Sequence, residues 1–409
     1  MTAPSSTVPG ETVQSLDAAH VLQTYKRAPV VFSRGEGVYL FDTSGRRYLD
    51  LISGVGVASL GHAHPGLAQA LGDQARTLLH TSNLCYHELQ GPVAAHLASL
   101  SGLSRTFFCN SGTEAVEACL KFARRYWHTG GHHHRTGLVA LEHAFHGRTL
   151  GSLSVTWDEH YRLPFEPLLP HVRWIPADDP DALAAAITDS TAAVIVEAIQ
   201  GEGGVRPLQA AMAEAITQAQ ARTGTLLIAD EVQCGLGRTG RPFGYQTLGL
   251  RPDLVAVGKA LGGGMPVGAA LLHERIATTV TLGDHGSTYG GNLLACRAAL
   301  VFLEALMSGG LLDHVGRVGA HLGRGLSQLA GQYPVVGDVR GAGLMWGLDL
   351  RVDATPFVEN ALAAGLLINR TAGTVIRLLP PFVLTEAQAD EALALMGEVF
   401  ARTIAEQAA

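Results

Sequence analysis

Short apolar runs alternate with longer helical segments through the middle of the chain, between about residues 100 and 270. Four strand-like runs are RTFFCN (105–110), TAAVIVEAI (191–199), TLLIADEV (225–232) and DLVAVG (253–258). The first two are followed by TEAVEACLKFARRYW and QAAMAEAITQAQART, whose apolar residues recur at helical spacing. This rhythm predicts an α/β fold, with a mainly parallel sheet whose strands are joined by crossover helices.

The pattern changes after about Gly310. Helical stretches are expected around VGDVRGAGLMWGLDL (336–350) and TVIRLLPPFVL (374–384), as parts of a smaller α+β unit. At 409 residues the chain is also too long for one ordinary core. The expected division is an N-terminal segment that packs with the small domain (1–54), a large domain (55–308) and a C-terminal small domain (309–409).

The composition narrows the class of protein. Hydrophobic residues make up 47% and charged residues 16%, with 49 glycines, which is typical of α/β enzymes and excludes disorder. A net charge of −7 argues against a nucleic acid partner. The start of the chain does not resemble a signal peptide and no eighteen-residue apolar run occurs, so no membrane partner is expected. Five scattered cysteines, none in C-x-x-C spacing, favour a reducing, cytoplasmic location.

The segment TGTLLIADEVQCGLGRTG (223–240) contains a glycine pattern that needs care. Gly235, Gly237 and Gly240 fit G-x-G-x-x-G, the fingerprint of dinucleotide-binding folds. In that motif the last glycine opens a helix, whereas here Arg-Pro-Phe-Gly follows Gly240. The residue before a proline is biased away from the helical conformation, so the glycine pattern lacks the helix that a dinucleotide fingerprint needs. A nicotinamide dehydrogenase is therefore disfavoured, and it stays as an alternative from a different class of protein.

A phosphate cradle is better supported at FFCNSGTEAVEACLKFAR, where a strand leads into a helix. Ser111 is predicted to cap this helix, with Glu114 completing a capping box. The free amides of Gly112 and Thr113 and the Ser111 and Thr113 hydroxyls would then face an anion at the positive end of the helix dipole. An ordinary capped helix has the same pattern.

A lysine and an aspartate at the ends of two other strands favour a phosphate cradle over an ordinary capped helix. Lys259 directly follows DLVAVG and precedes three glycines, where partial desolvation favours its neutral, nucleophilic form. Asp230 ends TLLIAD. A phosphate cradle, a strand-end lysine and a strand-end acid together suit pyridoxal phosphate, whose aldehyde condenses with lysine and whose pyridine nitrogen must stay protonated.

Several longer motifs resemble those of class III aminotransferases, which have the fold type I architecture of pyridoxal phosphate enzymes. In order along the chain they are NSGTEAVEA, FHGRT, VEAIQGEGGV, ADEVQCGLGRTG, GKALGGGMPVG and HGSTYGGN. The resemblance extends from YKRAPVVFSRGEGVYLFDTSGRRYLDL to VIRLLPPFVL. It is strongest to the acetylornithine aminotransferases and to the acyl-lysine aminotransferases of lysine biosynthesis.

The resemblance implies a role for each residue of the cofactor site. Lys259 would bond to the cofactor aldehyde and move a proton between substrate and cofactor. Asp230 would pair with the pyridine nitrogen, Gln233 would contact the phenolic oxygen and Phe145 would stack on the ring. The cofactor phosphate would be held by Ser111, Gly112, Thr113 and, across the interface of a homodimer, Thr288.

The resemblance also implies substrate contacts. Arg148 would bind the carboxylate of the amino donor and Arg377 the α-carboxylate of 2-oxoglutarate or glutamate. Glu202 would cover Arg377 while the donor reacts, and Tyr25 would contact the donor's carboxylate end. Val55 stands where ornithine aminotransferases have a tyrosine, which favours an acylated donor. One departure is Ala198, which replaces the proline of the common VEPIQGE motif.

The expected reaction is transfer of the ω-amino group of N-acetylornithine to 2-oxoglutarate, as in arginine biosynthesis. Acetyl-lysine or carrier-bound lysine, ornithine and 4-aminobutyrate are alternative donors. A catalytically idle cofactor-binding scaffold is disfavoured because the lysine, the aspartate and both arginines are present. The tract GGHHHRTG could hold a metal through His132–His134, but its flanking glycines favour a solvated loop.

Overall fold

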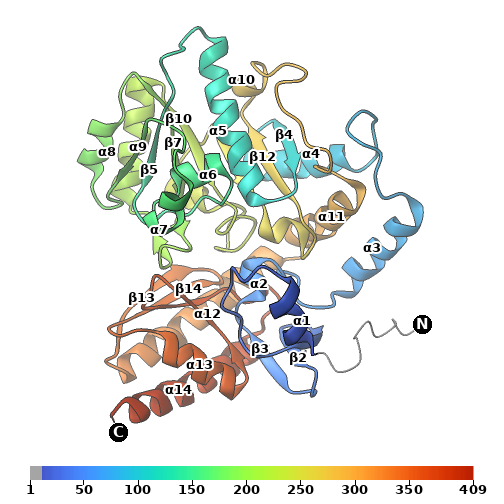
Figure 1. Ribbon diagram of the computed structural model, residues 1–409, viewed down its shortest axis with the longest axis vertical. Coiled ribbons are helices and arrows are strands. Elements are labelled where there is room, and N and C mark those ends of the chain that lie inside the picture. Colours follow the sequence, from blue (N-terminus) through green and yellow to red (C-terminus); the bar gives the residue numbers. More distant parts are fainter. Residues whose placement is uncertain (1–11, 409) are drawn as a thin grey trace.

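The computed structural model describes residues 12–408, so the first eleven residues of the expected N-terminal segment lie outside the described part. A seven-stranded sheet with the order β4-β12-β11-β10-β7-β5-β6 forms the upper part of the molecule (Figure 1). β12 is antiparallel to both of its neighbours, and the other pairings are parallel. The strands are β4 (Arg105–Cys109), β5 (Gly137–Leu141), β6 (Val172–Ile175), β7 (Thr191–Glu197), β10 (Leu226–Asp230), β11 (Leu254–Val257) and β12 (Gly268–Leu272).

Helices flank this sheet, which confirms the predicted α/β class. Neighbouring strand residues belong to different cores: Ile195 and Ile228 pack with the residues of α5, whereas Val194 and Leu227 belong to the larger core. The strands are therefore covered on both faces, as their continuous apolar runs require. The helices of this part are α3 (Pro65–Thr77), α4 (Gln90–Ser101), α5 (Gly112–Thr129), α6 (Leu150–Val155), α7 (Glu159–Arg162), α8 (Pro180–Ala186), α9 (Ala210–Thr223), α10 (Glu274–Ala277) and α11 (Leu293–Ser308).

The helical stretches expected in the C-terminal part are wrong. Residues 336–350 form an antiparallel hairpin, with a turn at Gly343 whose φ is +56°. Four glycines in fifteen residues disfavour a helix there, and two prolines close the second stretch. The four-stranded sheet has the order β13-β14-β17-β16, with β13 (Val336–Ala342), β14 (Met345–Leu350), β16 (Asn369–Thr371) and β17 (Val375–Leu378).

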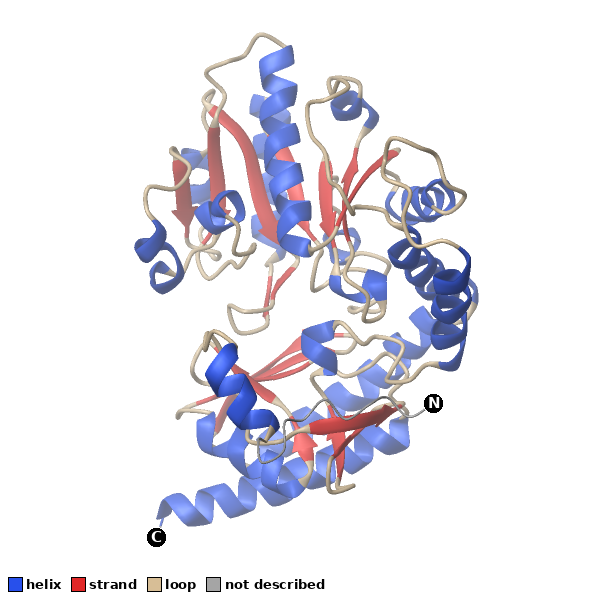
Figure 2. Cartoon of the chain, turned by 45° about the vertical axis from the view of Figure 1, so that its right-hand side comes forward, coloured by secondary structure: helices blue, strands red, loops and turns tan. Residues whose placement is uncertain are grey.

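Strands near the two ends of the chain share a third sheet. Its order is β1-β2-β3-β15, and β3 (Arg47–Asp50) runs parallel to β15 (Leu366–Leu367). Figure 2 shows these strands beside the C-terminal sheet and its helices, below the large sheet. This pairing supports the expected packing of the N-terminal segment with the C-terminal part. The remaining elements include β1 (Phe32–Glu36), β2 (Tyr39–Asp42), α1 (Val13–His20), α2 (Ser53–Gly56), α12 (Leu311–Gln332), α13 (Thr355–Ala364) and α14 (Glu386–Ala408).

No single helix in residues 12–408 is long and apolar enough to span a membrane. Only α11 and α12 taken together reach that length and hydropathy, as a pair bent by 72°.

Candidate active site

Two acids meet at the carboxyl edge of the large sheet because β7 and β10 are in register. Glu197 pairs directly with Asp230, and each residue ends its strand. Oδ1 of Asp230 accepts the N–H of Val232 at 3.1 Å, and Oδ2 lies 2.7 Å from Nδ1 of His146. Asp230 is therefore buried with both oxygens held in place.

Lys259 lies at the same edge, just after β11, and begins the short helix η3 (Lys259–Gly262). Its φ of +40° is unusual for a residue with a side chain, and such strained positions occur often at functional sites. Burial lowers the pKa of its amine to about 8, an effect that Glu202 and Asp230 oppose and Arg377 reinforces. The neutral amine is therefore far more accessible near neutral pH than in an ordinary lysine.

The start of α5 lies beside this lysine. A Cβ on Gly258 would come within 3.1 Å of Cα of Gly112, and a Cβ on Gly112 would lie 2.5 Å from Cγ1 of Val232. Only glycine fits at residue 112, and the chain there passes between β11 and the segment after β10. The first amides of a helix have no acceptor within the helix, so those of Gly112 and Thr113 can bind an anion.

The predicted capping box forms only in part. Oγ of Ser111 accepts the N–H of Glu114 at 3.3 Å, as predicted. The Glu114 carboxylate instead accepts the N–H of Asn110 at 2.6 Å, one residue before the cap. Ser111 has extended backbone (φ −155°, ψ 163°), as is usual for the residue that caps the start of a helix.

Thr113 links the cradle to the loop that carries Arg148. Its hydroxyl oxygen accepts the N–H groups of Arg148 and Thr149 at 3.1 and 3.2 Å, and it lies 2.7 Å from Oγ of Ser152. The guanidinium of Arg148 in turn lies over the ring of Tyr161, 3.6 Å from its centroid. The Thr113 hydroxyl is thus committed to this loop, which leaves its backbone amide for an anion.

The second predicted arginine is buried and paired. Nη1 of Arg377, on β17, lies 2.5 Å from Oε1 of Glu202 and donates to Oε1 of Gln233 at 3.2 Å. Arg377 pairs with Glu202 even though the two lie on different parts of the molecule. Burial would raise the pKa of Glu202, but the positive charges of Arg377 and Lys259 outweigh it and hold this pKa below its usual range.

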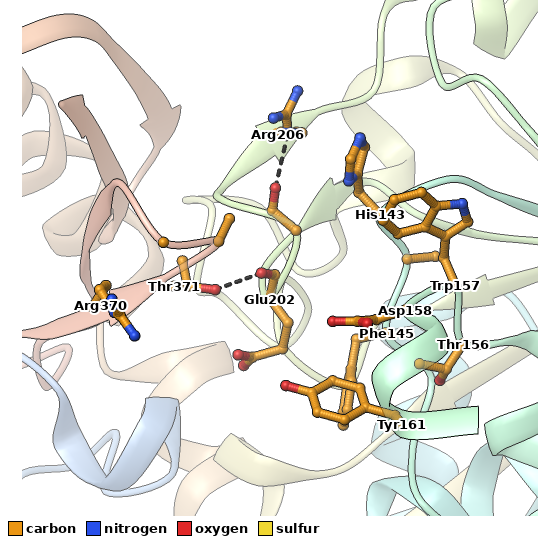
Figure 3. Close-up of a pocket in the computed structure, with 14 residues that line it drawn as sticks. His143, Phe145, Thr156, Trp157, Asp158, Tyr161, Glu202, Arg206, Arg370 and Thr371 are labelled. Atoms are coloured by element: carbon orange, nitrogen blue, oxygen red, sulfur yellow. Dashed lines mark hydrogen bonds between the residues drawn. The ribbon is translucent and has the colours of Figure 1, made fainter. Parts of the chain in front are cut away.

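A cavity of about 540 Å³ opens beside these residues. Figure 3 shows Phe145, Tyr161 and Glu202 facing one another across it, and the hydroxyl of Thr371 donates to the backbone carbonyl of Glu202. A further wall is formed by His143 and Trp157, whose ring centroids are 4.4 Å apart. The cavity is large enough for a small amino acid substrate.

Phe145 and Glu202 are the predicted residues that line this cavity, and Tyr25, Thr288 and Val55 lie elsewhere in the single chain. Tyr25 is 76% exposed and is absent from the cavity wall that the structure describes. Thr288 is also exposed. Val55 has a left-handed backbone (φ +65°) and packs against the apolar cluster that contains Ile199 and Cys234.

The sequence analysis missed two buried residues of this site, His146 and Glu197. Oε1 of Glu197 accepts the N–H of Phe145 and Oε2 the N–H of Gly201, both at 3.1 Å, and burial raises the pKa of this carboxyl. Both residues had a signal: Glu197 ends a buried strand as Asp230 does, and His146 directly follows Phe145 in FHGRT.

The glycine pattern that suggested a dinucleotide site has a structural role instead. No helix follows Gly240 directly, and Arg238 between the glycines is fully buried. Its Nη1 donates to the carbonyl oxygens of Leu344 and Pro380 at 2.9 and 2.5 Å, and burial lowers its pKa to about 9. The segment therefore joins the large sheet to the C-terminal part.

Comparison with known proteins identifies the class. Residues 21–400 match the family described as aminotransferase class-III, and the chain belongs to this family. It is a pyridoxal phosphate-dependent aminotransferase, with the fold that its motifs predicted.

Individual relatives refine this placement. The chain is 45% identical to the acetylornithine aminotransferase of Archaeoglobus fulgidus, over 92% of this chain and 97% of the relative. It is 42% identical to that of Methanocaldococcus jannaschii, over 94% and 97% of the two chains. Among solved structures, N-acetylornithine aminotransferase from Stenotrophomonas maltophilia has a TM-score of 0.83 at 32% identity, covering 96% and 99%. Ornithine aminotransferase from Toxoplasma gondii has a TM-score of 0.92 at 31% identity, covering 96% and 95%.

The residues present fit pyridoxal phosphate. The glycine-lined start of α5 offers free amides for the phosphate, and a Cβ at Gly112 would clash with Val232. Asp230 offers a buried carboxylate for a protonated ring nitrogen, and Lys259 a partly buried amine. The donor set thus matches the phosphate, the ring nitrogen and the aldehyde of the cofactor.

Proposed function

We propose that this aminotransferase moves the ω-amino group of N-acetylornithine to 2-oxoglutarate, giving N-acetylglutamate semialdehyde and glutamate. The observation that carries the proposal is the pairing of Arg377 with Glu202, and an aliphatic residue at Val55 agrees with it. The names of the relatives, at 41–45% identity over nearly the whole chain, support the same donor.

The site residues have the following roles in this proposal. Bound pyridoxal phosphate supplies an electron-accepting ring that stores the amino group between the two half-reactions. The amides of Gly112 and Thr113 would hold its phosphate, Phe145 would stack on its ring and Asp230 would keep its ring nitrogen protonated. Nζ of Lys259 would move a proton from the substrate carbon that bears the amino group to the cofactor, and would move one in the opposite direction in the second half-reaction.

The two arginines separate the two substrates. Arg148 binds the carboxylate of the acylated donor while Glu202 neutralises Arg377. When 2-oxoglutarate enters, Glu202 swings away and Arg377 binds the α-carboxylate, since a guanidinium matches a carboxylate with two parallel N–H donors. One cavity can then serve a donor with one reacting end and an acceptor with two carboxylates.

Kinetic comparison of donors tests the proposal. kcat/KM should be highest for acetylornithine in a series with ornithine, acetyl-lysine and 4-aminobutyrate at fixed 2-oxoglutarate. A higher value for acetyl-lysine would assign the enzyme to an acyl-lysine donor and to lysine biosynthesis instead. A cytoplasmic location, which the scattered cysteines favour, is part of the same proposal.

Val55→Tyr is expected to raise kcat/KM for ornithine relative to acetylornithine. Valine offers no hydrogen bond to a free α-ammonium, whose desolvation costs roughly 1 to 3 kcal/mol, while an acylamide loses much less. Wild type should therefore discriminate against ornithine by about tenfold to a hundredfold or more. Both substrates are measured in both proteins.

A matched control for Val55→Tyr is Val57→Tyr, two residues further along and outside the proposed donor site. It should leave the substrate ratio unchanged. Equal values for the two substrates in wild type, or no gain for ornithine in Val55→Tyr, would count against an acylated donor and would favour a packing role for Val55.

Thr288→Ala is expected to weaken cofactor retention through the neighbouring subunit of a homodimer. Exposure of Thr288 in the single chain supports such a role across an interface. Mixed dimers of Lys259→Ala chains with Thr288→Ala chains should place both defects in one site and leave the other intact. Cofactor content and activity of purified mixed dimers measure this, and the absence of any intact site would contradict sharing.

A further inference from the structure

A second cavity, of about 410 Å³, lies beside α5 and the histidine tract that the aminotransferase site does not use. α5 begins at the phosphate cradle, and its residues that line the cavity start at Lys121, nine residues or about 14 Å along the helix at 1.5 Å per residue. The loop after α5 reaches the end of the molecule opposite the C-terminal sheet (Figure 1). The cavity is therefore separate from the catalytic site of the same chain.

Four cationic residues gather at this cavity. Lys121, Arg124, Arg125 and Arg135 line it, and Asp284 is its only lining carboxylate among the described residues. The chain as a whole carries a net charge of −7, so a local excess of three positive charges runs against the overall balance. Like charges gathered in one cavity repel one another unless an anion is present.

Two of these guanidinium groups have buried nitrogen atoms without partners. Nη1 of Arg135 and Nε of Arg124 are buried and have no hydrogen-bond partner. Arg135 is only 9% exposed, and its nearest carboxylate, Asp189, is 3.7 Å away and 92% exposed. Burial lowers the pKa of Arg124. Buried cationic groups without a counter-charge are costly, and an anion in the cavity would offset the charge of both guanidinium groups without bonding to these two occluded nitrogens.

The other contacts hold these groups in position. Arg135 donates through Nη2 to the carbonyl of Thr223 at 2.8 Å and stacks 4.1 Å above the centroid of Trp127. Arg124 donates through Nη2 to the carbonyl of Thr136 at 3.2 Å. Arg125 pairs with Asp284 at 2.8 Å. Each arginine is thus fixed by at least one contact, and Arg124 and Arg135 both line the cavity.

The histidine tract forms one edge of the cavity. His132 packs edge-on against Trp127 at 5.5 Å, and His133 against His128 at 4.6 Å. The three rings of the tract are exposed, as predicted for a solvated loop, but His132 and His133 contact the end of α5. No group of three or more His, Cys, Asp or Glu residues suited to a metal occurs in residues 12–408.

We propose that this cavity is a binding site for a small phosphate-bearing anion. Guanidinium groups bind phosphate oxygens through paired N–H donors, and two arginines with a lysine suit a group with at least two negative charges. The cavity holds on the order of a dozen water volumes, taking about 30 Å³ for each, which suits a small metabolite. The histidines add donors at the rim.

Titration calorimetry of the cofactor-loaded enzyme with pyrophosphate tests the site. Arg124→Gln should weaken binding by about tenfold or more, because a charge-assisted hydrogen bond is lost. Lys121→Gln, at an exposed position of the same wall, should weaken it by a smaller factor. Arg251→Gln removes an exposed arginine elsewhere and should leave both binding and turnover unchanged.

Two further measurements separate the possible sources of binding. Arg148→Gln should bind pyrophosphate as wild type does, since the site is remote from the catalytic arginines. Citrate, a carboxylate polyanion, should bind more weakly than pyrophosphate. The proposal is overturned if pyrophosphate does not bind, if Arg124→Gln and Lys121→Gln, with normal melting temperatures, bind it like wild type, if Arg148→Gln abolishes binding, or if citrate binds more tightly.

Discussion

Lys259→Ala is expected to abolish steady turnover and the visible absorbance of the bound cofactor. The variant removes the only amine that the structure places beside Asp230 and the cradle. The sequence contains only three lysines, and the other two have partners elsewhere. Lys26 pairs with Glu359, and Lys121, in the middle of α5, contacts His285. Turnover with acetylornithine and the absorption spectrum of the purified variant measure the effect.

Lys26→Ala is the matched control, because it removes an exposed lysine from the same chain. It should retain the spectrum and the rate of wild type. Borohydride reduction followed by peptide mapping should attach the cofactor to Lys259 alone. Steady turnover in Lys259→Ala above that of a preparation without enzyme would refute the assigned role of this lysine.

The sequence predicted the large sheet well because its strands are buried on both faces. Such strands read as continuous apolar runs, and TAAVIVEAI and TLLIADEV are clear examples. The C-terminal hairpin was predicted wrongly because its strands are short and rich in glycine, so neither a period of two nor a helical period stands out. The reversed direction of β12 had no sequence signal, since strand direction depends on the tertiary path of the chain.

The residues of the site were predictable where they follow a strand. Asp230 and Lys259 each end or follow a buried run, and strand ends of a parallel sheet meet at one edge. His146 stands beside Phe145 in FHGRT, but no local pattern shows its contact with Asp230, which lies 84 residues further along the chain. The pairing of Arg377 with Glu202 also depends on how two parts of the molecule meet. That pairing was expected from the family resemblance, whereas the contact of His146 with Asp230 was not.

Asp230→Asn is expected to lower kcat by about two to four decades, comparable to the loss of a well-placed electrostatic stabiliser. The carboxylate is 4% exposed, so its charge acts in a medium of low dielectric constant. A neutral amide no longer favours a protonated pyridine nitrogen, and cofactor retention should weaken too. The rate per bound cofactor and the dissociation constant of the cofactor are measured separately.

Glu231→Gln distinguishes loss of charge at Asp230 from general disruption of the strand end. Glu231 is the next residue and equally buried, but its two oxygens accept the N–H groups of Tyr245 and Gly244, both at 2.8 Å. Burial raises its pKa to about 7, so its charge is already partly lost near neutral pH. The Glu231→Gln variant should have a lower melting temperature than wild type, but its rate per bound cofactor should stay within a few-fold of wild type. An equal loss of rate in both variants, or an Asp230→Asn enzyme within a few-fold of wild type, would mean that Asp230 does not act on the ring nitrogen.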